Sequence, residues 1–215
     1  MKQIDIQIAE RLLRINAIKL QPDNPFVWAS GWNSPIYTDM RLTLSYPDMR
    51  NFIKVELSRL IMENYGDVDL IASVATGAIA QGALVADTLG LPFAYVRDTP
   101  KDHGLENLIE GNIKPGQKVV VVEDLLSTGS NCLKASQNIT MAGGDVLGMV
   151  VMFDYQFELA KETFSKAGMP LLSICNYSAM IKAATQSGYI KEDDVEKLQQ
   201  WHKDPVNWTP SNKID

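Results

Sequence analysis

Short apolar runs alternate along this chain with segments of helical periodicity, and this alternation constrains the fold more than any other feature. Five runs are predicted to be strands: 70–74, 91–96, 118–122, 146–153 and 171–175. Because these runs are apolar at successive positions, each strand is expected to be buried on both faces, as in a parallel sheet covered by helices. Helices are predicted between them over 78–89 and 132–141. The pattern indicates an α/β fold with a mostly parallel sheet.

The segments outside the strand and helix alternation predict smaller elements around the sheet. Residues 3–18 have apolar positions at helical spacing, and 20–44 combine four aromatic residues with three prolines, which suits an irregular, hairpin-like appendage. Ser45 and Asp48 have the spacing of a helix cap before another helical stripe. Two final helices are expected over 178–187 and 192–201. We therefore expect one domain over 1–215 with a small appendage at about 20–44.

Composition and charge exclude several classes of protein. Hydrophobic residues make up 46% and charged residues 21% of the chain, which is the ordinary globular mixture. The net charge of -6 argues against a broad basic surface, so we expect no nucleic-acid partner. Cys132 and Cys175 lack metal-binding spacing and are predicted to be buried thiols. Charges throughout the first residues and the absence of a long apolar run predict a cytoplasmic protein with no membrane contact.

Residues 119–131, with the sequence VVVVEDLLSTGSN, are the most informative segment for function. A buried strand ends in two acids, and a small polar turn then leads into a helix. Free N–H groups and the helix dipole favour an anion at such a point, beyond the carboxyl end of a strand. Hydroxyl groups can add donors, and Gly129 permits a positive φ or a close backbone approach. The chain has neither the P-loop lysine motif nor the dinucleotide glycine motif.

The acid pair Glu123 and Asp124 disfavours a bare phosphate nearby and calls for hydroxyl groups or cations as partners. A phosphorylated sugar satisfies both parts of the segment, with its phosphate in the turn and its hydroxyls on the acids. The alternative is that the acids cap a loop and the turn only joins a strand to a helix.

As a whole, 119–131 resembles the thirteen-residue signature of the phosphoribosyltransferases. Four further segments resemble the orotate phosphoribosyltransferases in the right order: 30–41, 72–87, 95–111 and 175–190. The resemblance implies the type I phosphoribosyltransferase fold, a five-stranded mostly parallel sheet with a small hood, and a homodimer. It implies a Mg²⁺-dependent glycosyltransferase of pyrimidine (UMP) biosynthesis. Such an enzyme joins orotate to 5-phosphoribosyl 1-diphosphate (PRPP) and releases orotidine 5'-monophosphate and pyrophosphate.

The same resemblance implies a role for individual residues. Arg97, Lys101 and His103 match the family's lid positions, which grip pyrophosphate and reach the neighbouring subunit's site, and the last two are the candidate catalytic residues. Ser127, Ile36 and Tyr37 are expected to contact orotate. Mg²⁺ is expected to be held through the substrate and not directly by the protein. The remaining PRPP contacts are expected from the signature: Glu123, Asp124, Leu125, Leu126, Ser127, Thr128, Gly129, Ser130 and Asn131.

The chain also departs from the family pattern. Ala29 and Tyr155 stand where many members carry a lysine and an arginine that touch orotate, and Asn33 and Ala80 replace a usual lysine and proline. Asp98 adds a negative charge near the pyrophosphate site, although pairing with Arg97 would turn it to solvent. A purine or uracil phosphoribosyltransferase, or an RNA-binding regulator of the same fold, is the alternative.

Overall fold

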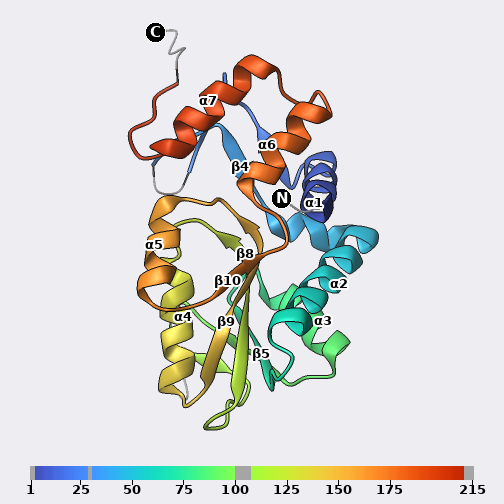
Figure 1. Ribbon diagram of the computed structural model, residues 1–215, viewed down its shortest axis with the longest axis vertical. Coiled ribbons are helices and arrows are strands. Elements are labelled where there is room, and N and C mark those ends of the chain that lie inside the picture. Colours follow the sequence, from blue (N-terminus) through green and yellow to red (C-terminus); the bar gives the residue numbers. More distant parts are fainter. Residues whose placement is uncertain (1–2, 29–30, 100–107, 211–215) are drawn as a thin grey trace.

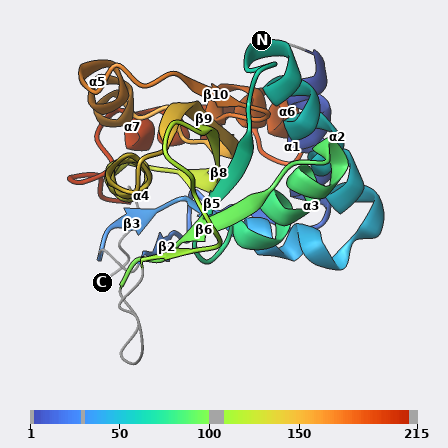
Figure 2. The ribbon, with the colours of Figure 1, turned by 90° about the horizontal axis from the view of Figure 1, so that it is seen from below.

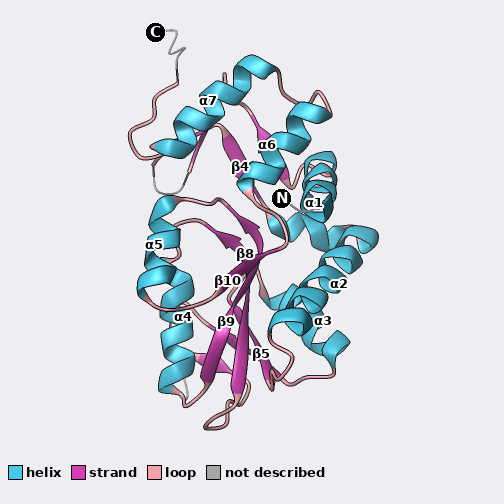
Figure 3. Ribbon diagram, in the orientation of Figure 1, coloured by secondary structure: helices cyan, strands magenta, loops and turns pink. Residues whose placement is uncertain are grey.

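The computed structural model describes residues 3–28, 31–99 and 108–210. In these residues the main sheet has six strands in the order β10-β9-β8-β5-β6-β7. Figure 3 shows this sheet at the centre, with helices around it. The strands are β5 (Leu70–Val74), β6 (Phe93–Val96), β7 (Ile109–Glu110), β8 (Lys118–Leu126), β9 (Asp145–Asp154) and β10 (Leu171–Ser173).

The predicted fold class is confirmed. Neighbouring strands from β10 to β6 are parallel, and only the two-residue strand β7 pairs antiparallel, at the edge of β6. These five parallel strands are the five that the apolar runs predict, although β8 continues to Leu126, through the acid pair. A strand as short as β7 has too few residues for a periodic signal.

β8 shows why its valines are apolar at every position. Val120 and Val122 belong to the larger hydrophobic cluster, and Val119 and Val121 to a second cluster on the opposite face. All four side chains are fully buried. Successive strand residues point to opposite faces, so a strand with helices on both sides has no position for a polar side chain.

The helices form layers on both faces of the sheet (Figures 1 and 2). One layer contains α1 (Gln3–Arg14), α2 (Pro47–Asn64) and α3 (Ile79–Leu89), and the other contains α4 (Ser130–Met141) and α5 (Glu158–Lys166). Helix α5 was not expected; it is short, and its fully buried apolar residues are Ala160 and Phe164.

The predicted start of α2 is wrong. Ser45 is the last residue of a 3₁₀ helix, η1 (Met40–Ser45), and α2 begins at Pro47 with Tyr46 as its N-cap and no side-chain cap. Proline at the first helical position has the φ that the helix needs and lacks an N–H that would have no partner there. It therefore starts the helix without the predicted Ser45–Asp48 cap.

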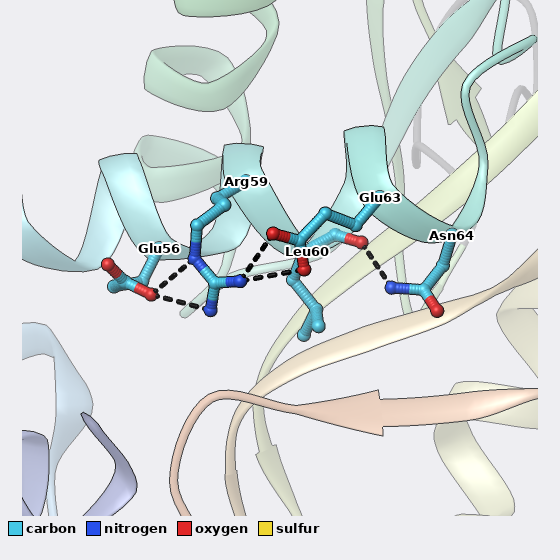
Figure 4. Close-up of polar contacts among 5 residues, drawn as sticks. All are labelled: Glu56, Arg59, Leu60, Glu63 and Asn64. Atoms are coloured by element: carbon cyan, nitrogen blue, oxygen red, sulfur yellow. Dashed lines mark hydrogen bonds and ion pairs between the residues drawn. The ribbon is translucent and has the colours of Figure 1, made fainter. Parts of the chain in front are cut away.

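A chain of polar contacts runs along α2 (Figure 4). Arg59 Nε donates to Glu56 Oε2 at 3.0 Å, and Arg59 Nη1 donates to Glu63 at 2.7 Å. Asn64 Nδ2 donates to the Leu60 carbonyl at 2.8 Å one turn before the helix ends. Pairs three and four residues apart stabilise a helix by about 0.3–0.5 kcal/mol each. They support α2 locally, while its buried residues are mostly apolar.

Residues 18–45 form two small antiparallel pairs and η1. Strand β1 (Ile18–Leu20) pairs with β4 (Ile36–Thr38), and β2 (Phe26–Val27) pairs with β3 (Asn33–Ser34). Helices α6 (Tyr177–Gln186) and α7 (Glu192–Lys203) lie beside β4 at one end of the molecule (Figure 1). None of the helices in the described ranges has the length and apolar character needed to cross a bilayer.

Candidate active site

A cleft of about 530 Å³ lies at the carboxyl ends of β5, β6 and β8. Ligands of open parallel sheets bind at this edge because backbone groups are free there and helices begin there. Its walls come from four segments distant in sequence, and the lining residues are Thr38–Arg41, Val74–Gly77, Asp98, Glu123–Leu125 and Ser127–Cys132.

The turn between β8 and α4 has the features of an anion site. Gly129 is the N-cap of α4 with φ +83°, and no side chain caps the helix, so the N–H groups of its first turn have no side-chain acceptor. A Cβ at Gly129 would lie 2.7 Å from the Phe164 ring, so glycine is required both for the positive φ and for space. Ser127, Thr128 and Ser130 add hydroxyl groups to the same wall. The expected strand, polar turn and helix start is confirmed.

The two acids at the end of β8 have different environments. Glu123 is only 6% exposed, and its Oε1 accepts from the Asp124 backbone N–H at 2.9 Å. Burial, followed by the contact with Asp124, raises the pKa of Glu123 well above its usual value. Asp124 is partly exposed in the cleft, and a Cβ at Gly77 would overlap its carboxylate. Asp124 is therefore the acid that a ligand can reach directly.

Asp39 and Arg41 form a charged pair on the wall made by residues 38–41, and neither was singled out from the sequence. Arg41 Nε lies 2.7 Å from Asp39 Oδ1, and Arg41 Nη2 lies 3.0 Å from Asp39 Oδ2. This two-point contact lowers the pKa of Asp39. Both residues lie at the end of the segment 30–41, directly after strand β4. This position is the sequence signal that could have marked them as site residues.

Three of the residues expected to bind orotate or PRPP lie away from the cleft wall. Ile36 is fully buried in the core, and the Tyr37 ring packs against Phe26 with ring centroids 5.5 Å apart. Leu126 is also fully buried, whereas its neighbours Leu125 and Ser127 line the cleft. The expected substrate contacts of Ile36, Tyr37 and Leu126 remain predictions. The positions of these side chains, away from the cleft lining, do not support them.

The lid segment is described only at its two ends. Arg97 Nη1 lies 3.7 Å from Glu110 Oε1, so Arg97 pairs across β6 and β7. Asp98 is exposed at the cleft, as expected for a solvent-facing side chain, and the ion pair of Arg97 is with Glu110. Lys101 and His103 lie outside the described residues, as does Ala29.

The charge of the cleft is strongly unbalanced. The described lining residues include four carboxyl groups, on Asp39, Asp98, Glu123 and Asp124, against a single cation, Arg41. Arg41 already pairs with Asp39. An anionic group that binds away from the α4 turn therefore needs cations from residues other than the described lining residues. Hydroxyl groups of a sugar, in contrast, are suitable partners for Asp124.

No protein-family model matches the chain. A curated relative, the orotate phosphoribosyltransferase of Bacteroides thetaiotaomicron, is 59% identical over 208 residues, which cover 97% of this chain and 98% of the relative. The crystal structure of orotate phosphoribosyltransferase from Aeropyrum pernix is 27% identical with a TM-score of 0.74, covering 86% of this chain and 99% of that one.

The structure of Leishmania donovani UMP synthase has a TM-score of 0.78 at 23% identity, and the match covers 92% of this chain and 42% of that longer protein. This last likeness concerns the fold alone. Since the Bacteroides relative is similar over almost the entire length of both proteins, the chain belongs to the orotate phosphoribosyltransferase family.

Proposed function

We propose that this enzyme carries out the reaction that gives its family its name. It transfers the 5-phosphoribosyl group from PRPP to N1 of orotate, and the products are orotidine 5'-monophosphate and pyrophosphate, in the biosynthesis of UMP. The observation that carries the proposal is the junction of the Ser127–Asn131 turn with Asp124 in one cleft. This junction offers an anion site and a hydroxyl acceptor at adjacent positions, as a phosphorylated ribose requires.

In the proposed complex, the 5'-phosphate accepts hydrogen bonds from the α4 turn, and Asp124 accepts them from ribose hydroxyls. Glu123 lies behind Asp124 and holds its backbone N–H at 2.9 Å. A protonated Glu123, favoured by burial, adds no second negative charge next to the sugar. Residues 20–44 act as a hood over the base, and Thr38–Arg41 are the part of it that lines the cleft.

Mg²⁺ is the proposed cofactor, and the residues of the cleft fit it. Carboxylate oxygens are the ligands that Mg²⁺ prefers, and it usually binds through one or two of them together with substrate phosphates. Mg²⁺ is proposed to be held through PRPP, and the carboxyl groups of Asp98 and Asp124, which line the cleft, give it acidic surroundings. When bound with PRPP, Mg²⁺ neutralises charge on the pyrophosphate. The acidic lining leaves this neutralisation to Mg²⁺ and to the lid.

The chain's own contribution to the proposed chemistry is binding, orientation and charge stabilisation. Arg97, Lys101 and His103 bring positive charge to the departing pyrophosphate from a closing lid, which stabilises the transition state more than the ground state. The C1'–O bond breaks and pyrophosphate leaves with the bonding electrons; N1 of orotate loses its proton and forms a bond to C1' from the opposite face, so no side-chain nucleophile is needed. We also propose a cytoplasmic homodimer in which the lid serves the partner subunit's site.

The direct test supplies PRPP and Mg²⁺ with orotate, uracil, adenine or hypoxanthine and measures pyrophosphate release. We expect turnover with orotate. Turnover with only a purine or uracil would show that the protein is a purine or uracil phosphoribosyltransferase instead. Salt-sensitive RNA binding without turnover would instead indicate a regulator.

Asp124→Asn tests the proposed ribose contact. The variant keeps the shape of the side chain but removes the charge, so PRPP affinity measured by calorimetry should fall by roughly ten- to a hundredfold. Asp145→Asn is the matched control, because Asp145 is exposed at the amino end of β9, the opposite end of the sheet from the cleft. Wild-type affinity in Asp124→Asn would place the ribose elsewhere.

A further inference from the structure

We propose that Tyr155 is a positioning residue for recognition of the base: its hydroxyl orients the hydroxyl of Thr38, which donates a hydrogen bond to an oxygen of orotate. The inference rests on the proposed function and adds a residue pair to it. Tyr155 and Thr38 are separated by 117 positions in the sequence, and their oxygens lie 2.9 Å apart. The contact joins the end of β9 to strand β4.

The Tyr155 ring is held on every side. It is 1% exposed and stacks on Phe157, with ring centroids 5.3 Å apart and an interplanar angle of 5°. Phe153 and Trp28 contact it edge-on at 5.3 Å and 5.4 Å. Aromatic pairs in these geometries add stability beyond area burial, so the ring has one fixed direction. The hydroxyl at its tip therefore has a fixed position as well.

The direction of the hydrogen bond follows from burial. Burial raises the pKa of Tyr155, so its hydroxyl keeps its proton. A buried O–H without an acceptor costs free energy, and Thr38 Oγ1 is the acceptor that lies within reach. We therefore assign the tyrosine as the donor. Thr38 accepts this bond and keeps its own hydrogen, for which the described residues show no acceptor.

Thr38 presents this hydrogen to the cleft. In β4, Ile36 is fully buried and Tyr37 is 39% exposed. Thr38 is half-buried and lines the cleft, on a wall that comes from a different chain segment than the α4 turn. The turn and Asp124 on β8 are engaged by the phosphate and the ribose. A donor supplied by β4 is therefore available to the remaining part of the ligand, the base.

The chemistry of orotate fits such a donor. Its two ring carbonyls and its carboxylate present only oxygen acceptors on those groups. The cleft is rich in carboxylates, which cannot donate when ionised, and its one described cation, Arg41, is paired with Asp39. A neutral hydroxyl that donates to the base meets this need without the desolvation cost of a buried charge.

The experiment measures steady-state KM for orotate and for PRPP in wild type, Thr38→Val, Thr38→Ser, Tyr155→Phe and the Thr38→Val/Tyr155→Phe double variant. Loss of one hydrogen bond in Thr38→Val should raise the KM for orotate roughly three- to tenfold, with the KM for PRPP changed by less than about twofold. Thr38→Ser keeps the hydroxyl and should remain near wild type. Tyr155→Phe should raise the same KM by a smaller factor, and the double variant should match Thr38→Val, because both changes remove one coupled unit.

The outcomes separate this inference from the proposed function. Failure of the wild type to convert orotate would reject the proposed function itself. With an active wild type, an unchanged orotate KM in Thr38→Val would overturn the role of Thr38. Additive effects of the two substitutions would overturn the coupling through Tyr155. Equal increases of both KM values would indicate a distorted wall and also reject the inference; thermal unfolding of each variant shows whether the fold is kept.

Discussion

Glu123 and Asp124 show how strongly the surroundings of a side chain determine what it can do. Both are acids at the end of β8, yet Glu123 is buried against Cys132, whose Sγ lies 3.5 Å from Glu123 Oε2, while Asp124 faces the cleft. Burial disfavours the charged form of a carboxyl group. One acid is therefore kept close to neutrality, and the other remains available as a hydrogen-bond acceptor.

Glu123→Gln tests this difference through the pH dependence of stability. The folded-state pKa of Glu123 lies above its ordinary value of 4.5, with burial as the largest cause. Its contribution to stability is thus fully present below the unfolded-state pKa and is lost as pH rises through the folded-state pKa. Glutamine stays neutral, so wild type should lose stability relative to Glu123→Gln as pH rises above about 4.5.

Urea unfolding of both proteins across a pH series measures this difference. Glu158→Gln is the control, since the Glu158 side chain is 71% exposed and should give a nearly constant difference from wild type. A Glu123→Gln difference that does not vary with pH would mean that Glu123 is ionised in the folded protein.

Among the elements, α7 (Glu192–Lys203) links the hairpin strands of the N-terminal region to the end of β9. Trp201 is fully buried, contacts the Trp28 ring at 5.6 Å and donates from Nε1 to the Asn33 carbonyl at 3.2 Å. His202 Nε2 lies 2.7 Å from the Tyr155 carbonyl, and its ring stacks on Tyr177. His202 thus has packing partners at the end of β9 and on α6. One helix therefore positions both the small hairpins and Tyr155.

Trp201→Ala should destabilise the protein by roughly 3–5 kcal/mol, because truncation leaves a cavity among four aromatic side chains that cannot all close around it. The contacting rings are Trp28, Tyr155, Phe157 and Tyr177, with His202 next to them. Met141→Ala serves as the control: Met141 is 77% exposed, and its truncation should change the free energy of unfolding by less than about 0.5 kcal/mol. Chemical denaturation of both variants provides the comparison, and equal midpoints would show that this link through α7 does not stabilise the protein.

At the scale of the whole molecule, the proposed homodimer has a two-fold axis, and each site takes its lid from the partner. Lys101→Ala removes a lid cation and should reduce the rate by about a hundredfold or more. Asp124→Asn damages the site that belongs to the subunit's own cleft. Mixing the two impaired proteins should then raise activity well above that of either alone, because each mixed dimer has one site with both lesions and one with neither.

Random exchange makes about half of the dimers mixed, each with one good site, so activity should recover to roughly a quarter of the wild-type rate. The measurement is orotate turnover after exchange, with mixed dimers verified by mass spectrometry. Activity that stays at background despite exchange would place each lid over its own subunit's cleft.

The sequence by itself determined the parallel sheet, the order of its main helices and the polar turn between β8 and α4, because each of these is encoded locally. The apolar composition of a run such as 118–122 predicts burial on both faces. The position of Gly129 between a strand and a helix likewise predicts its positive φ. Prediction failed where an element was too short to show a pattern, or where one residue did what another had been expected to do. Strand β7 has two residues, and Pro47 starts α2 without the predicted cap.

Only the tertiary structure decided which side chains reach the cleft. Ile36 and Thr38 lie two positions apart on one strand, yet Ile36 is fully buried in the main hydrophobic cluster, whereas Thr38 lines the cleft with its hydroxyl against that of Tyr155. Likewise, Glu123 is buried beside Cys132 on α4, and Asp39 and Arg41 reach the cleft because η1 packs against β8. The depth of a side chain depends on what distant segments pack against it, and no local pattern carries that information.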